Sequence, residues 1–406
     1  MSAAFRVEVV VIGAGVLGLA CARSISMLGK EVLILERTNT IASGTSSRNS
    51  EIIHAGLYYK PNELKTQFCV RGKNLLYDYC KTRNITHKKI GKLIVASNER
   101  QVSEDLDRIL RNAENNGVDD LKILSKHDVT YLEPDVESYG GILSPSTGIF
   151  DSHEYMLSLL ADAEENGSTM VLNCPVESVR MSNSEGEFSI IAEDGTEVLC
   201  DSVVNCAGLF AHDIASCIIN SARSFNNSET RNENQSFVSN YSDLSATANR
   251  TQYFAKGNYF QLVGQAAPFH HLIYPVPEPG GLGIHATLDC AGQCRFGPDV
   301  EWISKDVSCP DSIDMNVDPK RADVFYNAIR KYWPGLKDGA LIPDYAGLRP
   351  KLGHPNLNDG PSIKADFILE GPQQHGIKGF VNMIGMESPG LTSSLAIADR
   401  VASNMR

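Results

Sequence analysis

This sequence has little positive charge and no long apolar run. Its 37 lysine and arginine residues are outnumbered by 49 aspartate and glutamate residues, so the formal net charge is −12. Nucleic-acid binding needs a basic surface, and we therefore expect no nucleic acid among the partners. No apolar stretch approaches the roughly 20 residues of a membrane-spanning helix, so any contact with a membrane would be peripheral.

The ten cysteines follow no regular spacing. In a chain without a visible secretory signal, this pattern indicates free thiols in a reducing compartment. Cys290 and Cys294 could suggest a metal or redox pair, but a closed zinc site needs four ligands and Ala291-Gly292 favours a hairpin turn. We therefore expect no metal site. The first predicted strand begins close to Met1, which leaves no room for a cleavable targeting peptide.

The clearest motif lies near the N-terminus. An apolar, β-branched run at residues 9–12, preceded by Glu8, leads directly into Gly13, Gly15 and Gly18. This order predicts a buried parallel strand, a tight turn and a helix whose N-terminus faces a pyrophosphate. The glycine spacing alone gives weak support, because it also occurs in structural turns.

The segment that follows completes a dinucleotide-binding pattern. A helix ended by Gly29 precedes a second apolar strand at residues 31–35, which ends at Glu36. An acidic residue about 20 positions after the glycines is placed to bind ribose hydroxyl groups, so the pattern predicts FAD or NAD. The helix side chains expected to point inward are Ala20, Ile25 and Leu28.

A polar loop, residues 45–51, follows the ribose-binding strand. Such a loop either wraps the pyrophosphate and flavin or is simply solvated, and its position in the chain favours the cofactor. His54 comes next, in an expected strand at residues 52–59. From position alone, it is either a reactive group or a buried structural histidine.

Hydrophobic periodicity predicts most of the remaining elements. Residues 220–250 are the exception, since polar side chains dominate and few aliphatic ones are present to stabilise a fold. We expect a disordered surface insertion without a function there. The expected elements are helices at 62–82 and 103–115, a helix capped by Asp151 and ended by Gly167, strands at 91–96, 252–262, 272–277, 281–287 and 380–385, a β-meander at 176–206 with a turn at Asp194-Gly195, and a last helix after Glu387.

Several longer motifs remain, namely the runs 46–56, 91–95, 257–260, 274–277, 347–351 and 387–394. Together they resemble the L-2-hydroxyglutarate dehydrogenase family, which belongs to the D-amino-acid-oxidase-like FAD enzymes. The resemblance covers nearly the whole chain except the polar insertion, and residues 296–302 are most similar to the plant branch.

The resemblance, together with the two kinds of predicted sheet, implies an α/β fold of mixed α+β type. A Rossmann-like FAD-binding domain would be interleaved with an antiparallel-sheet substrate domain. We expect the FAD-binding domain to comprise residues 1–60, 150–215 and 340–406. The substrate domain would comprise residues 61–149 and 251–339.

The resemblance also implies the reaction and the partners. L-2-Hydroxyglutarate, a small dicarboxylate 2-hydroxy acid, would be oxidised to 2-oxoglutarate by hydride transfer from Cα to flavin N5. The electrons would pass to an acceptor other than NAD, either a quinone or an electron-transfer flavoprotein system. The family's usual location implies a mitochondrial enzyme of metabolite repair, peripheral to the inner membrane.

The reaction requires a base and two carboxylate sites. His54 is the first candidate for the base, with His285 as its rival and a purely structural histidine as the alternative. Related enzymes with a Gly-Leu-Arg-Pro segment imply that Arg349 binds the α-carboxylate, the alternative being a surface ion pair. For the distal carboxylate the sequence does not decide, although Tyr259 and Lys256 rank above the others. The candidates are Lys256, Tyr259, Tyr59 and Lys60.

The expected FAD-binding residues come from several separate parts of the chain. The last helix should begin at Pro389-Gly390 with its N-terminus directed at the flavin, where its dipole would stabilise negative charge. The full set is Gly13, Gly15, Gly18, Glu36, Arg37, Ser46, Ser47, Arg48, Asn49, Ala207, Gly208, Gly385, Ser388, Gly390, Leu391 and Thr392.

Other classes of function stay open at this point. An oxidase or dehydrogenase of an α-amino or imino acid would need the same FAD and arginine, and its release of ammonia would identify it. A non-catalytic FAD-binding protein would hold flavin that no substrate reduces. An NAD-linked dehydrogenase fits the first glycine motif, but it needs neither the turn at residues 388–390 nor the second sheet.

Overall fold

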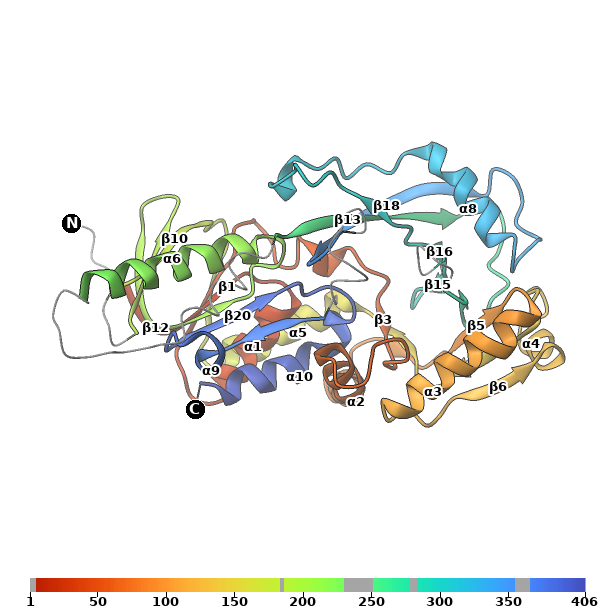
Figure 1. Ribbon diagram of the computed structural model, residues 1–406, viewed down its shortest axis with the longest axis horizontal. Coiled ribbons are helices and arrows are strands. Elements are labelled where there is room, and N and C mark those ends of the chain that lie inside the picture. The colour runs from red at the N-terminus through yellow and green to blue at the C-terminus, as the bar shows by residue number, and fades with distance from the viewer. Residues whose placement is uncertain (1–4, 183–185, 230–250, 278–282, 355–365, 406) are drawn as a thin grey trace.

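The computed structural model describes residues 5–182, 186–229, 251–277, 283–354 and 366–405. Its strands form two large sheets, toward opposite ends of the long axis, and the chain crosses between them several times (Figure 1). One sheet has a parallel centre covered by helices, and the other is mostly antiparallel. The predicted α/β fold of mixed α+β type is therefore confirmed.

The first sheet has eight strands. They are β1 (Phe5–Ile12), β2 (Val32–Leu35), β9 (Thr169–Val171), β10 (Val176–Met181), β11 (Phe188–Ala192), β12 (Glu197–Asn205), β19 (Ile368–Glu370) and β20 (Phe380–Ile384). β1 pairs in parallel with β2 on one side and with β12 on the other, and β20 pairs in parallel with β12. The carboxyl ends of these four strands therefore meet at one edge of the sheet.

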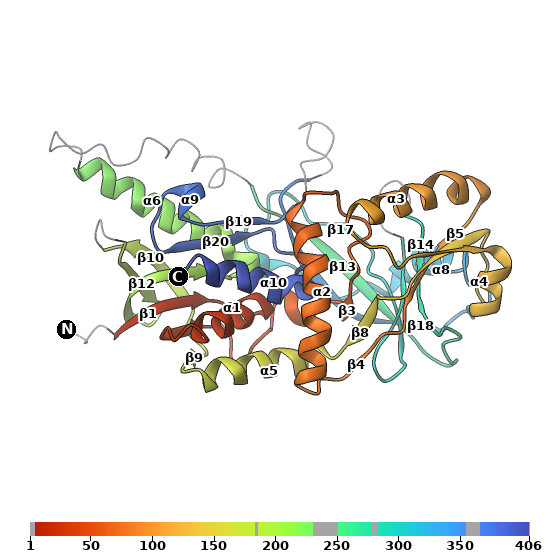
Figure 2. The same ribbon diagram turned by 90° about the horizontal axis from the view of Figure 1, so that it is seen from below.

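Helices cover both faces of this sheet. Because side chains alternate along a strand, Val9 and Val11 of β1 join one buried cluster, while Val10 and Ile12 join the other. The first face packs against α1 (Val16–Ser26), α2 (Leu64–Thr82), α5 (Ser152–Glu165) and α10 (Gly390–Ser403), as Figure 2 shows. The second face packs against α6 (Ala211–Glu229).

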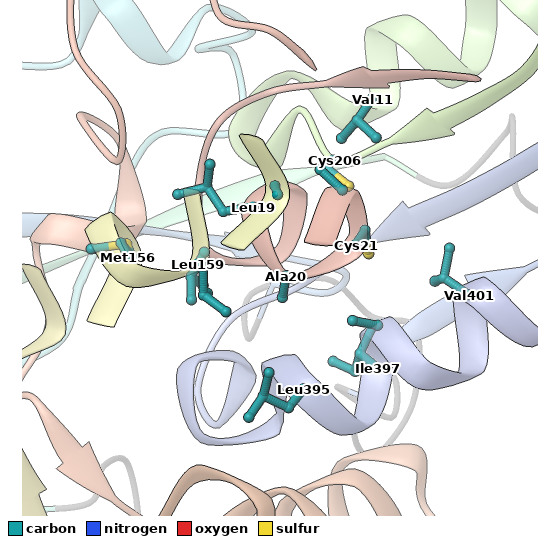
Figure 3. Packing of buried hydrophobic residues seen from close by; sticks show 14 of the residues in the cluster. Val11, Leu19, Ala20, Cys21, Met156, Leu159, Cys206, Leu395, Ile397 and Val401 are labelled. Atoms are coloured by element: carbon teal, nitrogen blue, oxygen red, sulfur yellow. The ribbon is translucent and has the colours of Figure 1, made fainter. Parts of the chain in front are cut away.

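The core on the first face joins segments that are far apart in the sequence (Figure 3). Leu19, Leu159 and Leu395 come from α1, α5 and α10 and are all buried, each contributing about 1.5–3 kcal/mol of burial free energy. Gly72 of α2 lies against the start of α10, where an added Cβ would be 2.4 Å from the carbonyl oxygen of Thr392. Only glycine permits this close approach of the two helices.

The second sheet has nine strands. They are β5 (Lys92–Ala96), β6 (Lys122–Ser125), β7 (Gly140–Ser144), β13 (Tyr253–Leu262), β14 (Leu272–Pro275), β15 (Ala286–Leu288), β16 (Cys294–Phe296), β17 (Glu301–Trp302) and β18 (Leu341–Lys351). β5 pairs in parallel with β14, whereas β13 and β18 form a long antiparallel pair. Two clusters of buried hydrophobic residues lie beside this sheet. Helix α8 (Ala322–Ile329) packs in the first cluster, and α3 (Asp107–Asn115) packs in the second.

A small sheet and short helices connect these parts. The sheet consists of β3 (Ile52–Ile53), β4 (His87–Lys88) and β8 (Gly148–Phe150). The short helices include α4 (Lys126–Leu132), α9 (Pro372–His375) and the π-helical segment Gln101–Leu106. Short 3₁₀ helices are present at Thr45–Ser47, Gly208–Phe210, Pro310–Ser312 and Pro319–Arg321.

Most predicted elements are confirmed within a few residues. They include α1, α2, α5, α10, β5, β13, β20 and the meander β10–β12. Asp151 caps α5, because its Oδ1 accepts hydrogen bonds from the backbone N–H groups of His153 and Glu154 at 2.9 and 2.8 Å. The residues between Cys290 and Cys294 form the turn that joins β15 to β16, as expected.

Two predictions near the N-terminus are wrong in detail. Helix α1 ends at Ser26, so the turn that follows it directs Leu28 outward and leaves this side chain 37% exposed. The strand predicted at residues 52–59 is limited to Ile52–Ile53. Gly56, with a φ of 93°, then turns the backbone away from an extended course.

Two later boundaries also differ. Residues 220–229 continue α6 instead of beginning a disordered insertion, because Ile218, Ile219 and Ala222 anchor this part of the helix in the core. The rest of the predicted insertion, 230–250, lies outside the described residues. The strand predicted at 281–287 is observed only from Ala286, and residues 281–282 lie outside the described residues.

The membership of elements in the two sheets can be compared with the predicted domain segments. The predicted FAD-binding segment 340–406 includes β18, which lies in the second sheet and pairs with β13 from Leu341 to Lys351. Conversely, α2 falls in the predicted substrate domain but packs in the core of the first sheet. The predicted domain boundaries stay predictions.

Candidate active site

A cavity of about 790 Å³ is lined by residues from both large sheets. Ile12 and Leu35 end β1 and β2, and Cys206 directly follows β12. Tyr259 of β13 and Arg349 of β18 line the same cavity. Ligands of parallel α/β sheets bind outside the carboxyl ends of the strands, so the cavity occupies the edge at which a dinucleotide is expected.

The glycine turn after β1 opens onto this cavity. Gly13 has a φ of 103°, and an added Cβ would be 2.6 Å from the carbonyl oxygen of Cys206. Gly18 lies so close to the turn that its Cβ would be 1.8 Å from the carbonyl oxygen of Gly13. Glycine is therefore required at both positions, and the N-terminus of α1 is held where it can face a pyrophosphate.

Glu36 lies at the end of β2 and is almost fully buried, with 7% exposure. Its Oε2 accepts a hydrogen bond from the backbone N–H of Ala14 at 2.8 Å, which fixes the carboxylate beside the glycine turn. Its Oε1 accepts hydrogen bonds from the backbone N–H and the hydroxyl of Thr38. Arg37 also lines the cavity, but Asp311 pairs with its guanidinium through two contacts of 2.7 Å.

The predicted polar loop borders the cavity and joins the two sheets. Ser46 lies in a short 3₁₀ helix, Thr45–Ser47, and its Oγ accepts a hydrogen bond from the backbone N–H of Val16 at 3.0 Å. The hydroxyl of Thr45 donates to the carbonyl oxygen of Leu348 in β18 at 3.0 Å. The loop is therefore held between the N-terminus of α1 and the strand that carries Arg349.

His54 lines another part of the cavity. Its backbone N–H donates to the hydroxyl of Thr392 at 3.1 Å, and its ring Nε2 lies 3.4 Å from the Oγ of Ser388. Burial, and to a smaller extent the positive charges of Lys92 and Arg349, together lower the pKa of His54 to about 3. The imidazole is therefore neutral at physiological pH and has a lone pair with which to accept a proton.

Arg349 projects from β18 and is only partly exposed. Among the described residues, no carboxylate forms an ion pair with its guanidinium within 4.0 Å. A partly buried arginine without a carboxylate partner is suited to a carboxylate ligand, which it can bind through two parallel hydrogen bonds.

A buried network of charged side chains supports the turn that directly precedes α10 and contains Glu387. Glu387 pairs with Lys65 of α2 at 3.1 Å and with Lys351 of β18 at 2.7 Å. Burial alone would raise the pKa of Glu387, but Lys65, Lys351 and Arg349 outweigh burial and lower it below its ordinary value. Glu387 is thus an anion that ties the turn to both sheets, and sequence reasoning did not identify this role.

Aromatic side chains form a wall near His54 and Arg349. The rings of Tyr274 and His285 stack with centroids 3.6 Å apart, and Tyr259 stacks on Tyr345 at 4.5 Å. The hydroxyls of Tyr259 and Ser50 lie 2.9 Å apart. The wall residues that line the cavity are Tyr58, Tyr59, Tyr259, Tyr274 and His285.

The structure brings most predicted site residues together. Those that line the cavity are Gly13, Gly15, Glu36, Arg37, Ser46, Arg48, Asn49, His54, Tyr59, Ala207, Gly208, Tyr259, His285, Arg349, Ser388, Gly390 and Leu391. Six predicted residues do not line it, and all but the last lie next to residues that do. These six are Gly18, Ser47, Lys60, Gly385, Thr392 and Lys256.

Lys256 is the predicted substrate residue that the structure places elsewhere. Its Nζ donates to the carbonyl oxygen of Asn316 at 2.6 Å and lies 4.0 Å from Glu301. Lys256 and Tyr259 are three positions apart on β13, and an odd spacing directs side chains to opposite faces of a strand. This alternation could have shown from the sequence that both residues do not face one ligand. Lys60 also lies outside the cavity lining.

These residues fit a bound FAD. The glycine turn and the N-terminus of α1 can receive a pyrophosphate, Glu36 lies where a ribose is expected, and α10 begins at Gly390 on the cavity wall. Within the described ranges, no group of three or more His, Cys, Asp or Glu side chains is placed to hold a metal ion. Helices long and apolar enough to cross a membrane are likewise absent from the described part of the chain.

Comparison with known proteins gives a consistent result. Residues 8–225 and 239–404 match the FAD dependent oxidoreductase (DAO) family. The chain is 42% identical to the mitochondrial L-2-hydroxyglutarate dehydrogenase of Arabidopsis thaliana, over 98% of this chain and 83% of that protein. It is 30% identical to the protein of the same name from Pongo abelii, over 98% of this chain and 87% of that protein.

A solved structure supports the fold. An L-α-glycerophosphate oxidase from Mycoplasma pneumoniae with FAD bound superposes with a TM-score of 0.79 at 22% identity, over 98% of this chain and 94% of that chain. The chain therefore belongs to the FAD dependent oxidoreductase family and, within it, to the L-2-hydroxyglutarate dehydrogenases, with FAD as its cofactor.

Proposed function

We propose that this protein oxidises L-2-hydroxyglutarate to 2-oxoglutarate. The observation that carries the proposal is the placement of a neutral His54, and of Arg349 without a carboxylate partner among the described residues, in the cavity that also contains the glycine turn and Glu36. The names of the relatives supply the substrate, and the geometry supplies residues for its chemistry.

His54 is the base in this proposal. Its Nε2 accepts the proton of the C2 hydroxyl as the C–H bond is broken, which a neutral imidazole can do. The contact between Nε2 and the Ser388 hydroxyl orients the ring until substrate arrives. FAD, when bound, supplies the acceptor for the hydrogen and the two electrons that leave C2.

Arg349 positions the substrate. Its guanidinium binds the carboxylate attached to C2, and this interaction holds the hydroxyl near His54. The dianionic substrate also offsets the positive charges of Arg349 and Lys92, which otherwise oppose protonation of His54. Substrate binding therefore makes His54 a stronger base at the moment a base is needed.

The electron acceptor and the location complete the proposal. The electrons pass to a quinone or to an electron-transfer flavoprotein system rather than to NAD. The names of the relatives place those proteins in the mitochondrion, and we propose the same location, peripheral to the inner membrane, for this chain.

Product analysis tests the proposed substrate. The holoenzyme is incubated with L-2-hydroxyglutarate and an artificial electron acceptor, and the keto acid and ammonia are quantified. Formation of 2-oxoglutarate in amounts equal to the acceptor reduced supports the proposal. Turnover of an α-amino acid with release of ammonia, and none with the hydroxy acid, would overturn it.

A further inference from the structure

Lys92 is a buried cation that the proposed mechanism uses only indirectly. It lies at the start of β5 and is 1% exposed, one of the largest fully buried side chains in the described part of the protein. No carboxylate of the described residues pairs with it within 4.0 Å. Instead, its Nζ lies 4.8 Å from the ring centroids of both Tyr58 and Tyr274. Burying a charge without a counter-ion is costly, so its retention needs an explanation.

The two rings that contact Lys92 belong to the cavity wall. Tyr58 and Tyr274 line the cavity, whereas Lys92 lies behind them. The hydroxyl of Tyr58 is buried and has no hydrogen-bond partner among the described residues. A buried hydroxyl without a partner is itself unfavourable, and a ligand oxygen at the wall would satisfy it.

Lys92 differs from the other cations near the cavity in its burial and its partners. Arg37 lines the cavity but is paired with Asp311, and Arg48 is exposed on the polar loop. Arg349 is committed to the α-carboxylate in the proposed function. A dicarboxylate carries a second negative charge, and Lys92 is the buried positive charge beside His54 that lacks an anionic partner within the described ranges.

We propose that Tyr58 and Lys92 form the subsite for the distal carboxylate of the substrate. The Tyr58 hydroxyl donates a hydrogen bond to that carboxylate, and Lys92 supplies positive charge from behind the Tyr58 and Tyr274 rings. This inference rests on the proposed function and deepens it, because it explains selection of a dicarboxylate. Lys92 acts through the tyrosines and is a positioning residue, whereas Tyr58 contacts the substrate.

The charge on Lys92 makes the subsite sensitive to pH. Burial lowers the pKa of Lys92 to about 8, while Cys69 of α2 raises it slightly. The other groups that face it are Tyr274 from β14, and Tyr58 and His54 from the segment after β3. Its register partner on β7 is Ser144, which does not titrate, and Glu104 and Asp105 of the π-helical segment do not shift its pKa. Binding of the dicarboxylate should therefore weaken as the pH rises through about 8.

The test compares substrates with and without the second carboxylate. Holoenzymes of wild type, Lys92→Met, Lys92→Arg and Tyr58→Phe are assayed by anaerobic flavin reduction with L-2-hydroxyglutarate and with L-2-hydroxypentanoate. Lys89→Met is the matched control, because Lys89 lies over the ring of Tyr77, which does not line the cavity. The measured quantity is the ratio of kcat/KM for the two substrates, with the FAD content of each variant recorded.

We expect Lys92→Met and Tyr58→Phe each to lower this ratio by about tenfold to a hundredfold, mainly by raising KM for the dicarboxylate. Lys92→Arg should retain more of the ratio than Lys92→Met, and Lys89→Met should leave it unchanged. The loss of dicarboxylate binding above about pH 8 should be absent in Lys92→Met.

Equal losses for both substrates, or an unchanged ratio in Tyr58→Phe and in whichever Lys92 variants fold, would overturn the subsite while leaving the proposed function intact. A wild-type enzyme that L-2-hydroxyglutarate does not reduce would instead overturn the proposed function, and the subsite with it.

Discussion

The ring Nε2 of His54 and the Oγ of Ser388 lie 3.4 Å apart, although 334 residues separate them in the sequence. The first turn of α10 also holds the backbone at His54, because the hydroxyl of Thr392 accepts from the N–H of His54 and contacts the carbonyl oxygen of Ile52. The candidate base is therefore positioned by the same helix whose N-terminus borders the cofactor cavity. Its geometry therefore depends on the packing of α10 against α2 as much as on β3, the strand that it follows.

Replacement of the candidate base should affect the chemical step. In His54→Gln, we expect flavin reduction by L-2-hydroxyglutarate to slow by about 10²–10⁴-fold with FAD still bound, because the hydroxyl proton loses its acceptor. Stopped-flow absorbance measures this rate directly. His285→Gln is the matched comparison, since His285 lines the same cavity. Near-normal reduction in His54→Gln together with a large loss in His285→Gln would transfer the role to His285.

The pH profile of kcat/KM should show no ionisation near the ordinary pKa of histidine. Burial lowers the pKa of His54 to about 3, so this group stays neutral as the pH falls from 8 to 5. An unshifted histidine would titrate near 6.5, and kcat/KM would then fall at least tenfold by pH 5. We expect kcat/KM for L-2-hydroxyglutarate to show no such acid limb. A limb with an apparent pKa between about 6 and 7 that is absent in His54→Gln would contradict this account.

Removal of the candidate carboxylate-binding cation should weaken substrate binding. Arg349→Ala loses a charge-assisted interaction of about 2–4 kcal/mol, which corresponds to a KM increase of roughly 30-fold to 1000-fold with FAD retained. Steady-state kinetics and the visible flavin spectrum measure the two quantities. Arg330→Ala is a suitable control, because that arginine pairs with Asp338 and does not line the cavity. Unchanged KM and turnover in Arg349→Ala would exclude Arg349 from substrate binding.

Loss of the carboxylate at the end of β2 should release the cofactor. Glu36→Ala removes the acceptor for Ala14 N–H and the group expected to bind the ribose, so we predict an FAD affinity about tenfold to a hundredfold lower. Titration of apoprotein with FAD, followed by flavin fluorescence, measures this affinity. Glu8→Ala provides the comparison, since Glu8 contacts Lys30 and Glu31 away from the cavity. Equal FAD affinities in the two variants would show that Glu36 does not bind the cofactor.

A single methyl group between α2 and α10 should destabilise the fold. In Gly72→Ala, the new Cβ would lie 2.4 Å from the Thr392 carbonyl oxygen, so the helices must separate. We expect a loss of about 1–3 kcal/mol in the free energy of unfolding, measured by denaturant titration. Asn74→Ala, at an exposed position of the same helix, should stay within about 0.5 kcal/mol of wild type. Equal stability of both variants would mean that the helices adjust without cost.

The parts of the site that could be predicted from sequence depend on local spacing. Gly13 and Glu36 are separated by a single βαβ unit, so their proximity follows from the regular geometry of that unit. Leu28 was misjudged because helical periodicity does not reveal the residue at which a helix ends. Lys256 lies outside the cavity lining because side chains alternate along β13, which residue type alone does not reveal.

The remaining site residues depend on long-range packing. Lys92 contacts Tyr274 because β5 pairs with β14, and it contacts Tyr58 from the segment after β3. Glu387 meets Lys65 and Lys351 because α2 and β18 converge on the turn before α10. Neither contact has a local sequence signal, since the partners come from elements whose relative placement is set by the whole fold.

The most direct test of the central claim is anaerobic mixing of the holoenzyme with single substrates while the visible flavin absorbance is followed. The substrates are L-2-hydroxyglutarate, its D-enantiomer and several L- and D-amino acids. We predict rapid bleaching by L-2-hydroxyglutarate alone. Bleaching by an amino acid instead would keep the fold and the cofactor but contradict the proposed substrate, and a flavin that none of these compounds bleaches would contradict the proposed reaction.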